Sequence, residues 1–374
     1  MAQSTTLRLR GLWLQVHKWI GLLLAILIIP ISLSGSALVW HDWLDETLNP
    51  QRYDVKSSEA ELPPSAYAAA AAGVMEPGEK LVSLRYDEHK GPIVATIAPG
   101  PDSEAAKAAR PVRMSVWIDP ADGRVLDRAR SDSGAVRFLH GLHGSLTVPG
   151  VGRQIVGWVG IFMLLSSLTG LWLWWPLAGG IRRGLRWRRQ NALTPNLHHL
   201  AGFWIAIPLA MLSFTGAWIS FPAFFGAISG QSQPPGGADR ARALRARPLA
   251  ETATSPDEAL AAARPLAPGA IVSIAWPTDQ APEWKIGFAQ QGGPAEVKVA
   301  DSSGAITPPK PAQPETLART MRRWHDGTGM GPIWQIIIFL GGIAPALLAI
   351  TGVVMWLRSR GWRSRLRKRR PLRT

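Results

Sequence analysis

Four stretches of the chain are long, apolar and free of charged residues, at about Ile20–Val39, Ile155–Trp175, Leu200–Phe221 and Ile333–Leu357. Each has roughly the 20 residues that a helix needs to cross the hydrocarbon core of a bilayer. A length of 374 residues would otherwise suggest two or three soluble domains. The pattern therefore predicts an integral membrane α-helical protein with four transmembrane helices.

These runs divide the chain into eight segments. The first helix is expected within residues 1–41, and the other three are expected at 151–176, 197–221 and 332–357. Two long polar segments, 42–150 and 222–331, form external lobes, while 177–196 is a cytoplasmic loop and 358–374 is a basic cytoplasmic tail.

Charge gives the expected orientation. The net charge is +15, yet all 26 acidic residues lie within Asp42–Asp132 and Asp239–Asp326. Residues 1–41, 176–196 and 358–374 have no acidic residue and carry three, five and nine Lys and Arg residues. Because basic flanks stay in the cytoplasm, we expect a multi-pass protein of the bacterial inner membrane, with both termini cytoplasmic and both lobes periplasmic. The first apolar run is too long for an ordinary signal peptide and is expected to remain as an anchor.

Two further compositional features narrow the class of protein. The basic tail could indicate nucleic-acid binding, but beside a membrane helix it indicates contact with anionic lipid. We therefore expect membrane lipid as a partner and no nucleic acid. The chain has no cysteine, which excludes disulfides, iron–sulfur clusters and thiolate metal sites.

The chain contains an internal duplication. When "VHKWIGLLLAILIIPISLSGSALVW" is aligned with "LHHLAGFWIAIPLAMLSFTGAWISF", His17 pairs with His198, and a glycine follows 18 residues later in each, at Gly35 and Gly216. In the other two helical segments His143 pairs with His325. The interval from each of these histidines to the glycine of a Thr-Gly pair is 27 residues in both.

The external lobes repeat more weakly. Each has an Ala-rich helix, a Pro-Gly turn and a strand, followed by two strands around Asp122-Gly123 or Ser303-Gly304. Each half is thus a helix, a small α+β lobe and a helix. A pseudo-two-fold axis along the membrane normal should relate the halves, as in parallel repeats.

This symmetry brings the four histidines together as two pairs. His17 and His198 begin the first and third helices at the cytoplasmic edge, while His143 and His325 precede the second and fourth helices at the periplasmic edge. The latter two lie on short segments cut off by Pro149-Gly150 and Gly331-Pro332. One bis-histidine site at each membrane face fits two haem b groups, with the histidines as axial ligands of the iron.

Glycines and arginines support this hypothesis. Gly170 and Gly352 should lie level with His17 and His198, and Gly35 and Gly216 near His143 and His325, which leaves space for a flat macrocycle. Arginines near the outer pair could bind haem propionates. These are Arg137, Arg322 and Arg323.

Several alternatives stay open at this point. Histidines at helix ends can be interfacial residues, and Ser/Thr-Gly pairs can be helix-packing devices. Neighbours on a helix point about 100° apart, so only one of His198 and His199 can face the bundle. We assign His198, because the duplication pairs it with His17, whereas His199 aligns with Lys18. His41 and His140 are rivals for the outer site.

Four motifs of the chain resemble those of the PepSY-associated transmembrane-helix proteins. They are "LQVHKWIGLLL…LSGSALVW", "LHGSL…GVGRQIVGW…LTGLWLWWP", "NLHHLAGFW…FTGAW" and "WHDGTGMG…ITGVVMWLRSR". The external lobes are similar to degenerate PepSY domains, with "VWIDPADGRVL" the clearest match. The resemblance covers nearly the whole chain.

The resemblance implies an oxidoreductase: a di-haem b ferric-siderophore reductase that reduces imported iron complexes in the periplasm. It also implies His17, His198, His143 and His325 as the haem ligands. The electron donor is then a separate flavoprotein or a quinol on the cytoplasmic side. The alternatives are a haem-free PepSY sensor or peptidase regulator, and a metal or proton transporter that uses the histidine pairs.

Overall fold

The computed structural model describes residues 2–57, 59–87, 91–108, 111–175, 180–186, 190–230, 242, 245–290, 293–311 and 315–368. The chain divides into two compact units. Residues 1–41, 138–233 and 316–374 form a helical unit, and residues 42–137 and 234–315 form a sheet unit. Parts of the predicted cytoplasmic loop and of the basic tail lie outside the described residues.

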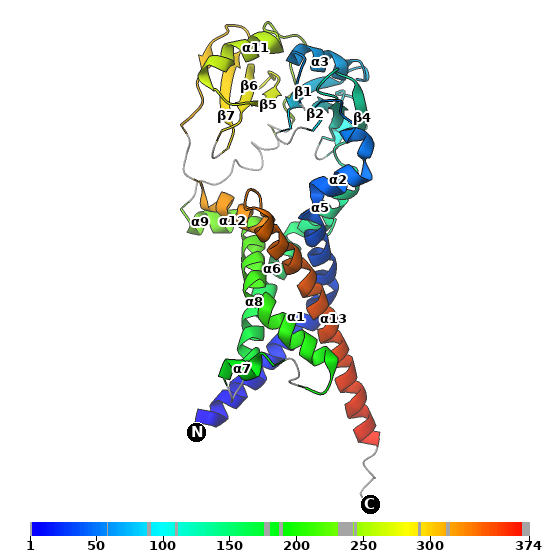
Figure 1. The fold of residues 1–374 in the computed structure, drawn as a ribbon, viewed down its shortest axis with the longest axis vertical. Helices are drawn as coiled ribbons and strands as arrows, with labels where there is room; N and C mark the ends of the chain where they lie inside the picture. The colour runs from blue at the N-terminus through cyan, green and yellow to red at the C-terminus, as the bar shows by residue number, and fades with distance from the viewer. Residues whose placement is uncertain are drawn as a thin grey trace, which may run out of the picture. The chain divides into compact units, whose positions relative to one another are not determined.

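The helical unit is built on four long helices (Figure 1), which are α1 (Ala2–Leu38), α6 (Gly152–Trp174), α8 (Leu193–Ser220) and α13 (Pro332–Lys368). Among the described residues, these four helices are long and apolar enough to cross a membrane. The predicted fold class is therefore confirmed: the chain is a multi-pass α-helical membrane protein with an α+β insertion.

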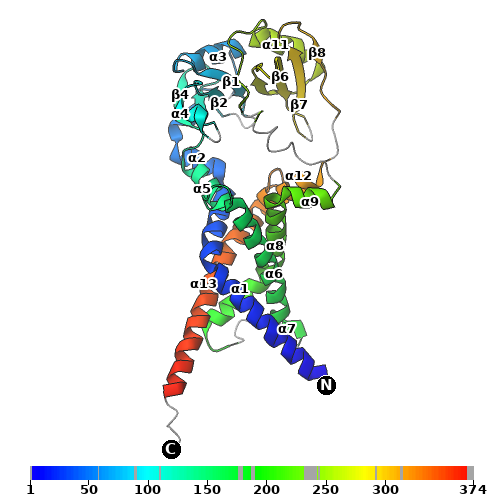
Figure 2. The ribbon, with the colours of Figure 1, turned by 180° about the vertical axis from the view of Figure 1, so that it is seen from behind.

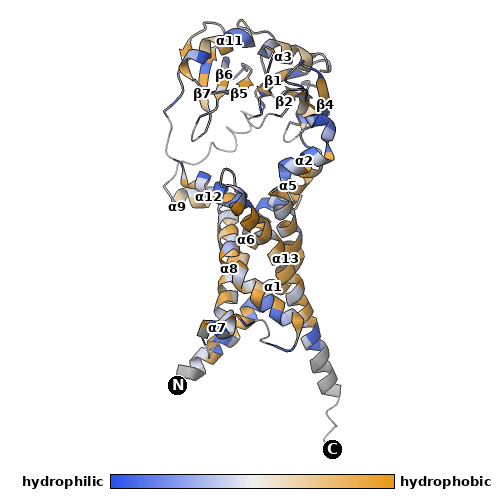
Figure 3. Ribbon diagram, viewed as in Figure 1, coloured by the Kyte–Doolittle hydropathy of each residue, from blue (hydrophilic) through white to orange (hydrophobic). Residues whose placement is uncertain are grey.

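The outer surface of these helices is apolar. Leu23, Ile26, Ile207 and Ile333 are each more than 70% exposed, which would be unfavourable in water and suits contact with lipid. Figure 3 shows the hydrophobic colouring concentrated along the middle of the helices, with hydrophilic residues toward their ends. The surface is thus adapted to a bilayer.

Among the long helices, α1 and α13 extend furthest beyond the predicted apolar runs. α1 begins at Ala2 rather than near Ile20, and α13 continues to Lys368 rather than ending near Leu357. Hydropathy marks only the part of a helix that suits lipid. Arg and Lys are good helix formers, so the basic flanks continue the same helices beyond the apolar runs.

Small residues allow the long helices to pack closely in two equivalent pairs. α1 packs against α13 and α6 packs against α8, as both views show (Figures 1 and 2). A Cβ atom on Gly342 would lie 2.8 Å from the carbonyl oxygen of Ser32, and one on Gly160 would lie 3.1 Å from that of Ser213. The duplication pairs Ser32 with Ser213, so the two contacts are equivalent, and in each of them a glycine lets two helices approach closely.

Five short helices lie next to the long ones in sequence among the described residues: α2 (His41–Leu48), α5 (Ala135–Ser145), α7 (Gly180–Gly184), α9 (Pro222–Ile228) and α12 (Leu317–Asp326). α5 precedes α6 and α12 precedes α13, with the Pro149-Gly150 and Gly331-Pro332 breaks between them. Gly327 ends α12 in the left-handed conformation, at φ 79°. The short segments that carry His143 and His325 are therefore as predicted.

The sheet unit contains a single antiparallel sheet of eight strands in the order β4-β3-β2-β1-β5-β6-β7-β8. The first half supplies β1 (Lys80–Arg85), β2 (Ile93–Ala98), β3 (Met114–Ile118) and β4 (Val125–Arg130). The second half supplies β5 (Ile271–Ala275), β6 (Glu283–Phe288), β7 (Ala295–Ala300) and β8 (Ile306–Thr307).

The two predicted lobes share this one sheet. β1 and β5 pair antiparallel, with Leu84 opposite Ile274, so the strand order on one side of this junction repeats on the other. The sequence did not anticipate β2, β6 or the joining of the halves. It correctly predicted the Ala-rich helices, α3 (Pro64–Ala72) and α11 (Pro256–Ala263), and the strand pairs around Gly123 and Gly304.

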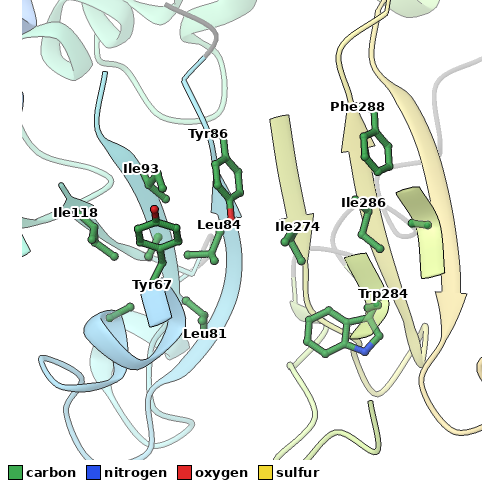
Figure 4. Packing of buried hydrophobic residues seen from close by; sticks show 14 of the residues in the cluster. Tyr67, Leu81, Leu84, Tyr86, Ile93, Ile118, Ile274, Trp284, Ile286 and Phe288 are labelled. Atoms are coloured by element: carbon green, nitrogen blue, oxygen red, sulfur yellow. The ribbon is translucent and has the colours of Figure 1, made fainter. Parts of the chain in front are cut away.

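α3 and α11 pack on one face of the sheet and bury a single continuous core. Tyr67 from α3 is fully buried among strand side chains that include Leu84 and Ile118, and Trp284 is fully buried in the other half (Figure 4). Burial of an aliphatic side chain such as Leu84 or Ile118 contributes about 1.5–3 kcal/mol. The core thus crosses the boundary between the repeats.

Two buried aspartates occupy equivalent places in the halves. Asp119 follows β3 and accepts a hydrogen bond from the backbone N–H of Lys56 at 3.0 Å. Asp301 follows β7 and accepts hydrogen bonds from the backbone N–H groups of Ala253 and Thr254 at 3.0 and 3.1 Å. Each carboxylate fixes the segment that leads into α3 or α11, which supports the duplication of the lobes.

The described residues of this unit also form three short elements, η1 (Pro50–Tyr53), α4 (Glu104–Lys107) and η2 (Arg264–Leu266). Arg52 on η1 stacks on the Trp117 ring at 4.0 Å and forms ion pairs with Asp45 at 3.3 Å and Asp127 at 2.6 Å. These contacts fix the start of the first lobe against the β3–β4 edge of the sheet.

Candidate haem-binding histidine pairs

The structure brings the four predicted histidines together as two pairs. The ring centroids of His17 on α1 and His198 on α8 lie 6.4 Å apart, with an angle of 84° between the ring planes. Those of His143 on α5 and His325 on α12 lie 5.8 Å apart, at 36°. Each pair takes one residue from each half of the chain, as the duplication predicts.

These separations suit one metal ion between the two rings. A ligating imidazole nitrogen lies about 2 Å from its metal and about 1 Å from its own ring centroid, so two axial rings have centroids about 6 Å apart. Both pairs lie close to that value.

The two pairs lie at opposite ends of the bundle. On α1, His17 is 18 residues from Gly35, the residue against which His143 packs. At 1.5 Å per residue this is about 27 Å along the helix, close to the thickness of a bilayer core. His17 and His198 lie toward the helix ends nearer the chain termini, and His143 and His325 lie at the other ends.

Each histidine lies against a glycine of a neighbouring helix. A Cβ on Gly35 would lie 2.6 Å from Cε1 of His143, and one on Gly216 would lie 3.0 Å from Cε1 of His325. The corresponding distances are 3.1 Å from Gly170 to His17 and 3.6 Å from Gly352 to His198. The glycines lie level with the predicted pairs, but they make space for the imidazole rings themselves, a role that the sequence interpretation assigned to the macrocycle.

The residue before each glycine helps to position the ring. Nδ1 of His17 lies 3.1 Å from Oγ1 of Thr169, Nδ1 of His325 lies 3.0 Å from Oγ1 of Thr215, and Nδ1 of His198 lies 2.9 Å from Oγ1 of Thr351. Backbone carbonyls are also close, Ser166 to His17 at 3.1 Å and Leu212 to His325 at 3.2 Å.

The fourth histidine uses a carbonyl in the same way. Nδ1 of His143 lies 2.8 Å from the carbonyl oxygen of Ile31. In the first half the residue before the glycine is Ser34, which donates to the carbonyl oxygens of Pro30 and Ile31 at 2.6 and 3.0 Å. The Ser/Thr-Gly pairs are therefore the places where the histidines contact the long helices.

These contacts determine the tautomer of each ring. A carbonyl oxygen only accepts, and the three threonine hydroxyls already donate to carbonyls one turn earlier. Thr169, for example, donates to the carbonyl oxygen of Leu165 at 2.9 Å. Nδ1 must then be the donor in all four rings, so the proton is on Nδ1 and Nε2 has a free lone pair. This is the arrangement of a metal-ligating histidine whose orientation is fixed by a second partner.

Electrostatics support neutral rings in the pair that lies outside the spanning helices. Burial lowers the pKa of His143. Burial is the main cause that lowers the pKa of His325 to about 4. The neighbouring His143 lowers this pKa further, and Arg322 does so more weakly. Both imidazoles are thus neutral near pH 7, the state that ligates a metal.

The donor set fits a haem better than an isolated metal ion. In the part of the chain that the structure describes, no three His, Cys, Asp or Glu residues are grouped closely enough to hold a metal ion. An isolated ion held by two imidazoles needs water for the rest of its coordination shell, and the four histidines of these pairs are partly buried. A haem iron needs the protein to supply only its axial ligands.

The rival histidines occupy other positions. His199 faces Gln190, whose Nε2 lies 3.4 Å from Nε2 of His199, while His198 faces His17. His41 and His140 lie with ring centroids 6.3 Å apart and form a third pair, which the sequence interpretation treated only as possible substitutes for the outer ligands.

The predicted propionate ligands lie near the outer pair in sequence. Arg322 and Arg323 stand on α12, three and two residues before His325, and Arg322 is exposed. Arg137 is exposed on α5, six residues before His143. Their contact with a haem remains a prediction.

The three contacting threonines were missed by the sequence interpretation. Their signal was present in Thr169-Gly170, Thr215-Gly216 and Thr351-Gly352, but a Thr-Gly pair in a membrane helix also suits plain helix packing.

Comparison with known proteins places this architecture in a family. A search of curated proteins finds no match to the chain. The PepSY-associated TM region family matches residues 14–359, nearly the whole sequence, including all four paired histidines. The chain therefore belongs to the PepSY-associated transmembrane family.

Proposed function

We propose that the protein is an inner-membrane oxidoreductase that binds two haem b groups and reduces ferric siderophores at the periplasmic face. The observation that carries this proposal is the repeated arrangement of His17, His198, His143 and His325. Nδ1 of each ring bonds to a neighbouring helix, which leaves the lone pair of Nε2 as the ligand. When bound, haem b supplies one-electron redox chemistry at each site.

The chain's own residues hold and orient the ligands. Thr169, Thr215 and Thr351 accept the Nδ1–H bonds, which fixes the ring planes and makes the opposite nitrogen a better donor. The apolar surroundings disfavour a charged imidazolium. Arg137, Arg322 and Arg323 are the proposed partners of propionates and of an anionic chelate at the outer site.

The proposed direction rests on charge and on the substrate's chemistry. The acid-free basic segments are proposed to be cytoplasmic, which gives both termini a cytoplasmic location and puts His143 and His325 on the periplasmic side. Hydroxamate and catecholate oxygens are hard ligands that hold Fe(III) better than Fe(II). One electron per iron therefore favours release of Fe(II) from the siderophore.

The remaining partners follow from this scheme. The electron donor is a flavoprotein or a quinol on the cytoplasmic side, and the substrate docks on the PepSY-like lobes. The helix motifs resemble those of the inner-membrane siderophore reductase FoxB, which supports a siderophore as the substrate class.

The first test is the visible spectrum of protein purified from haem-replete cells. Two haems per chain and a sharp α-band on reduction are expected. A colourless preparation would favour a haem-free PepSY sensor or peptidase regulator, or a His-dependent metal or proton transporter.

The second test uses proteoliposomes with a donor inside and a ferric siderophore outside. His143→Ala and His325→Ala are expected to lose the outer haem and Fe(II) release while the inner haem is still reduced. Normal Fe(II) release by a variant shown to lack the outer haem would exclude this mechanism.

A further inference from the structure

A third histidine pair lies beside the outer one. His41 is the first residue of α2 and His140 is on α5, and their ring centroids are 6.3 Å apart with an angle of 48° between the planes. His140 precedes His143 by three residues, so the two side chains lie on the same side of α5. Both rings of the third pair are exposed, whereas His143 and His325 are partly buried.

The duplication does not account for this pair. His41 aligns with Pro222 of the second half and His140 aligns with Arg322, so neither histidine is repeated. The other two pairs take one ring from each half, but His41 and His140 both come from the first half and from two short helices. Their proximity is therefore independent of the symmetry that generates the proposed haem sites.

The separation of the rings is that of two ligands on one ion. Two imidazoles that share a metal have centroids about 6 Å apart, and an exposed pair is accessible to an ion from solvent. Imidazole suits Fe(II), Zn²⁺, Ni²⁺ and Cu²⁺, while Mg²⁺, Ca²⁺ and Fe(III) prefer oxygen ligands.

We propose that His41 and His140 form a binding site for a divalent transition-metal ion, and that Fe(II) is the ion bound there during turnover. The choice of Fe(II) rests on the function proposed above, while the site itself does not. Among the described residues no third His, Cys, Asp or Glu completes a cluster here. The remaining coordination positions are left to water, which makes a weak site suited to an ion in transit.

Selectivity between oxidation states follows from the ligand type. Two neutral nitrogen donors hold Fe(II) better than Fe(III), which remains with the oxygen ligands of the siderophore. The pair thus captures the product of reduction without competing for the substrate.

The experiment is a calorimetric titration of the full-length protein in detergent with Zn²⁺, which has the same ligand preference and no redox chemistry. Wild-type protein is expected to bind Zn²⁺, and excess Mg²⁺ should not displace it. His41→Ala and His140→Ala should each weaken this binding by about 10-fold or more. Two separate variants guard against misfolding of either one.

Matched controls separate this pair from its neighbours. His143→Ala, one turn away on α5, and His199→Ala, at the other end of the bundle, should retain the Zn²⁺ affinity. Haem content should be unchanged in His41→Ala and His140→Ala. Unaltered Zn²⁺ affinity in those two variants, or loss of haem from them, or loss of the same Zn²⁺ site in His143→Ala, would overturn the proposal.

The titration also distinguishes the two proposals from each other. Zn²⁺ binding that depends on His41 and His140 in a protein that reduces no siderophore would leave the site intact and exclude only Fe(II) as a reaction product. Fe(II) release by the wild type together with unaltered Zn²⁺ affinity in both variants would exclude the His41–His140 site and leave the proposed reductase function intact.

Discussion

The imidazole of His17 donates from Nδ1 to the hydroxyl oxygen of Thr169, 3.1 Å away on a neighbouring helix. Thr169 in turn donates to the carbonyl oxygen of Leu165 at 2.9 Å, so its hydroxyl proton is already engaged. The contact therefore fixes one tautomer of His17 and leaves Nε2 as the ligating nitrogen of a ring whose centroid lies 6.4 Å from that of His198.

Removal of this hydroxyl should weaken the inner site. Thr169→Val keeps the shape of the side chain but removes one of the acceptors near Nδ1 of His17, leaving the carbonyl oxygen of Ser166 at 3.1 Å. The ring is then less fixed and less basic. We expect haem affinity at this site to fall by about 10-fold and its reduction potential to rise, because a less basic ligand stabilises Fe(III) less well. Potentiometric titration of both haems measures this, with Thr169→Ser as the conservative control. An unchanged potential in Thr169→Val would show that the contact has no influence on the iron.

A methyl group at Gly35 should disrupt the outer site. Its Cβ would lie 2.6 Å from Cε1 and 2.8 Å from Nδ1 of His143, which forces the ring away from His325. Gly35→Ala should therefore lose half of the haem, measured as pyridine haemochrome.

Gly352→Ala is the matched control, because there the Cβ would lie 3.6 Å from Cε1 of His198, an ordinary contact. Alanine stabilises a helix by about 1 kcal/mol relative to glycine, so neither variant should fail through helix propensity. Equal haem content in the two variants would contradict the steric argument.

Substitution of the adjacent histidines should have unequal effects. His198→Ala removes a ring that faces His17 at 6.4 Å and should reduce haem content by half. His199→Ala removes a ring that contacts Gln190 and should leave haem content near that of the wild type. The opposite result would mean that His199, and not His198, faces the bundle and binds the haem.

Acid should destabilise the haem-free protein through the outer pair. The pKa of His143 is lowered by burial, and that of His325 is lowered to about 4 from an ordinary value of 6.5. Above pH 6.5 both rings are neutral in the folded and unfolded states. As the pH falls from 6.5 toward 4, the unfolded chain takes up protons that the folded protein resists, so stability falls.

Thermal unfolding of the haem-free protein in detergent, measured from about pH 7 to about pH 5, checks this dependence. The double variant His143→Gln/His325→Gln should show a flatter profile over the same range. A wild-type profile as flat as that of the variant would exclude these two histidines as the source of acid sensitivity.

Membrane orientation is tested by reporter fusion. Fusions near residues 100 and 280 should report a periplasmic location, because both lie within the acidic segments of the chain. A cytoplasmic signal at either position would reverse the proposed direction of electron transfer.

Much of the architecture is a local property of the sequence. The four spans follow from apolar runs, because hydrocarbon accepts only helices whose backbone groups are satisfied internally. The pairing of His17 with His198 and of His143 with His325 follows from the duplication, because a symmetry axis that superposes two helices also superposes the residues at equal intervals along them. The choice of His198 over its neighbour required the duplication, which pairs His198 with His17 and His199 with Lys18, and the angle between successive residues on a helix, which lets only one of the two face the bundle.

Only the tertiary structure decided the contacts between segments distant in sequence. The pairing of Leu84 with Ile274 joins the halves into one sheet, and no local pattern specifies which strand edge meets which. The hydrogen bond of each paired histidine to the helix beside it, and the proximity of His41 to His140, depend on how helices cross, since crossing is set by close packing of small residues over many turns. Hydropathy and repeat spacing report which residues are buried or duplicated, but an atom-to-atom contact between separate helices exists only once the bundle is assembled.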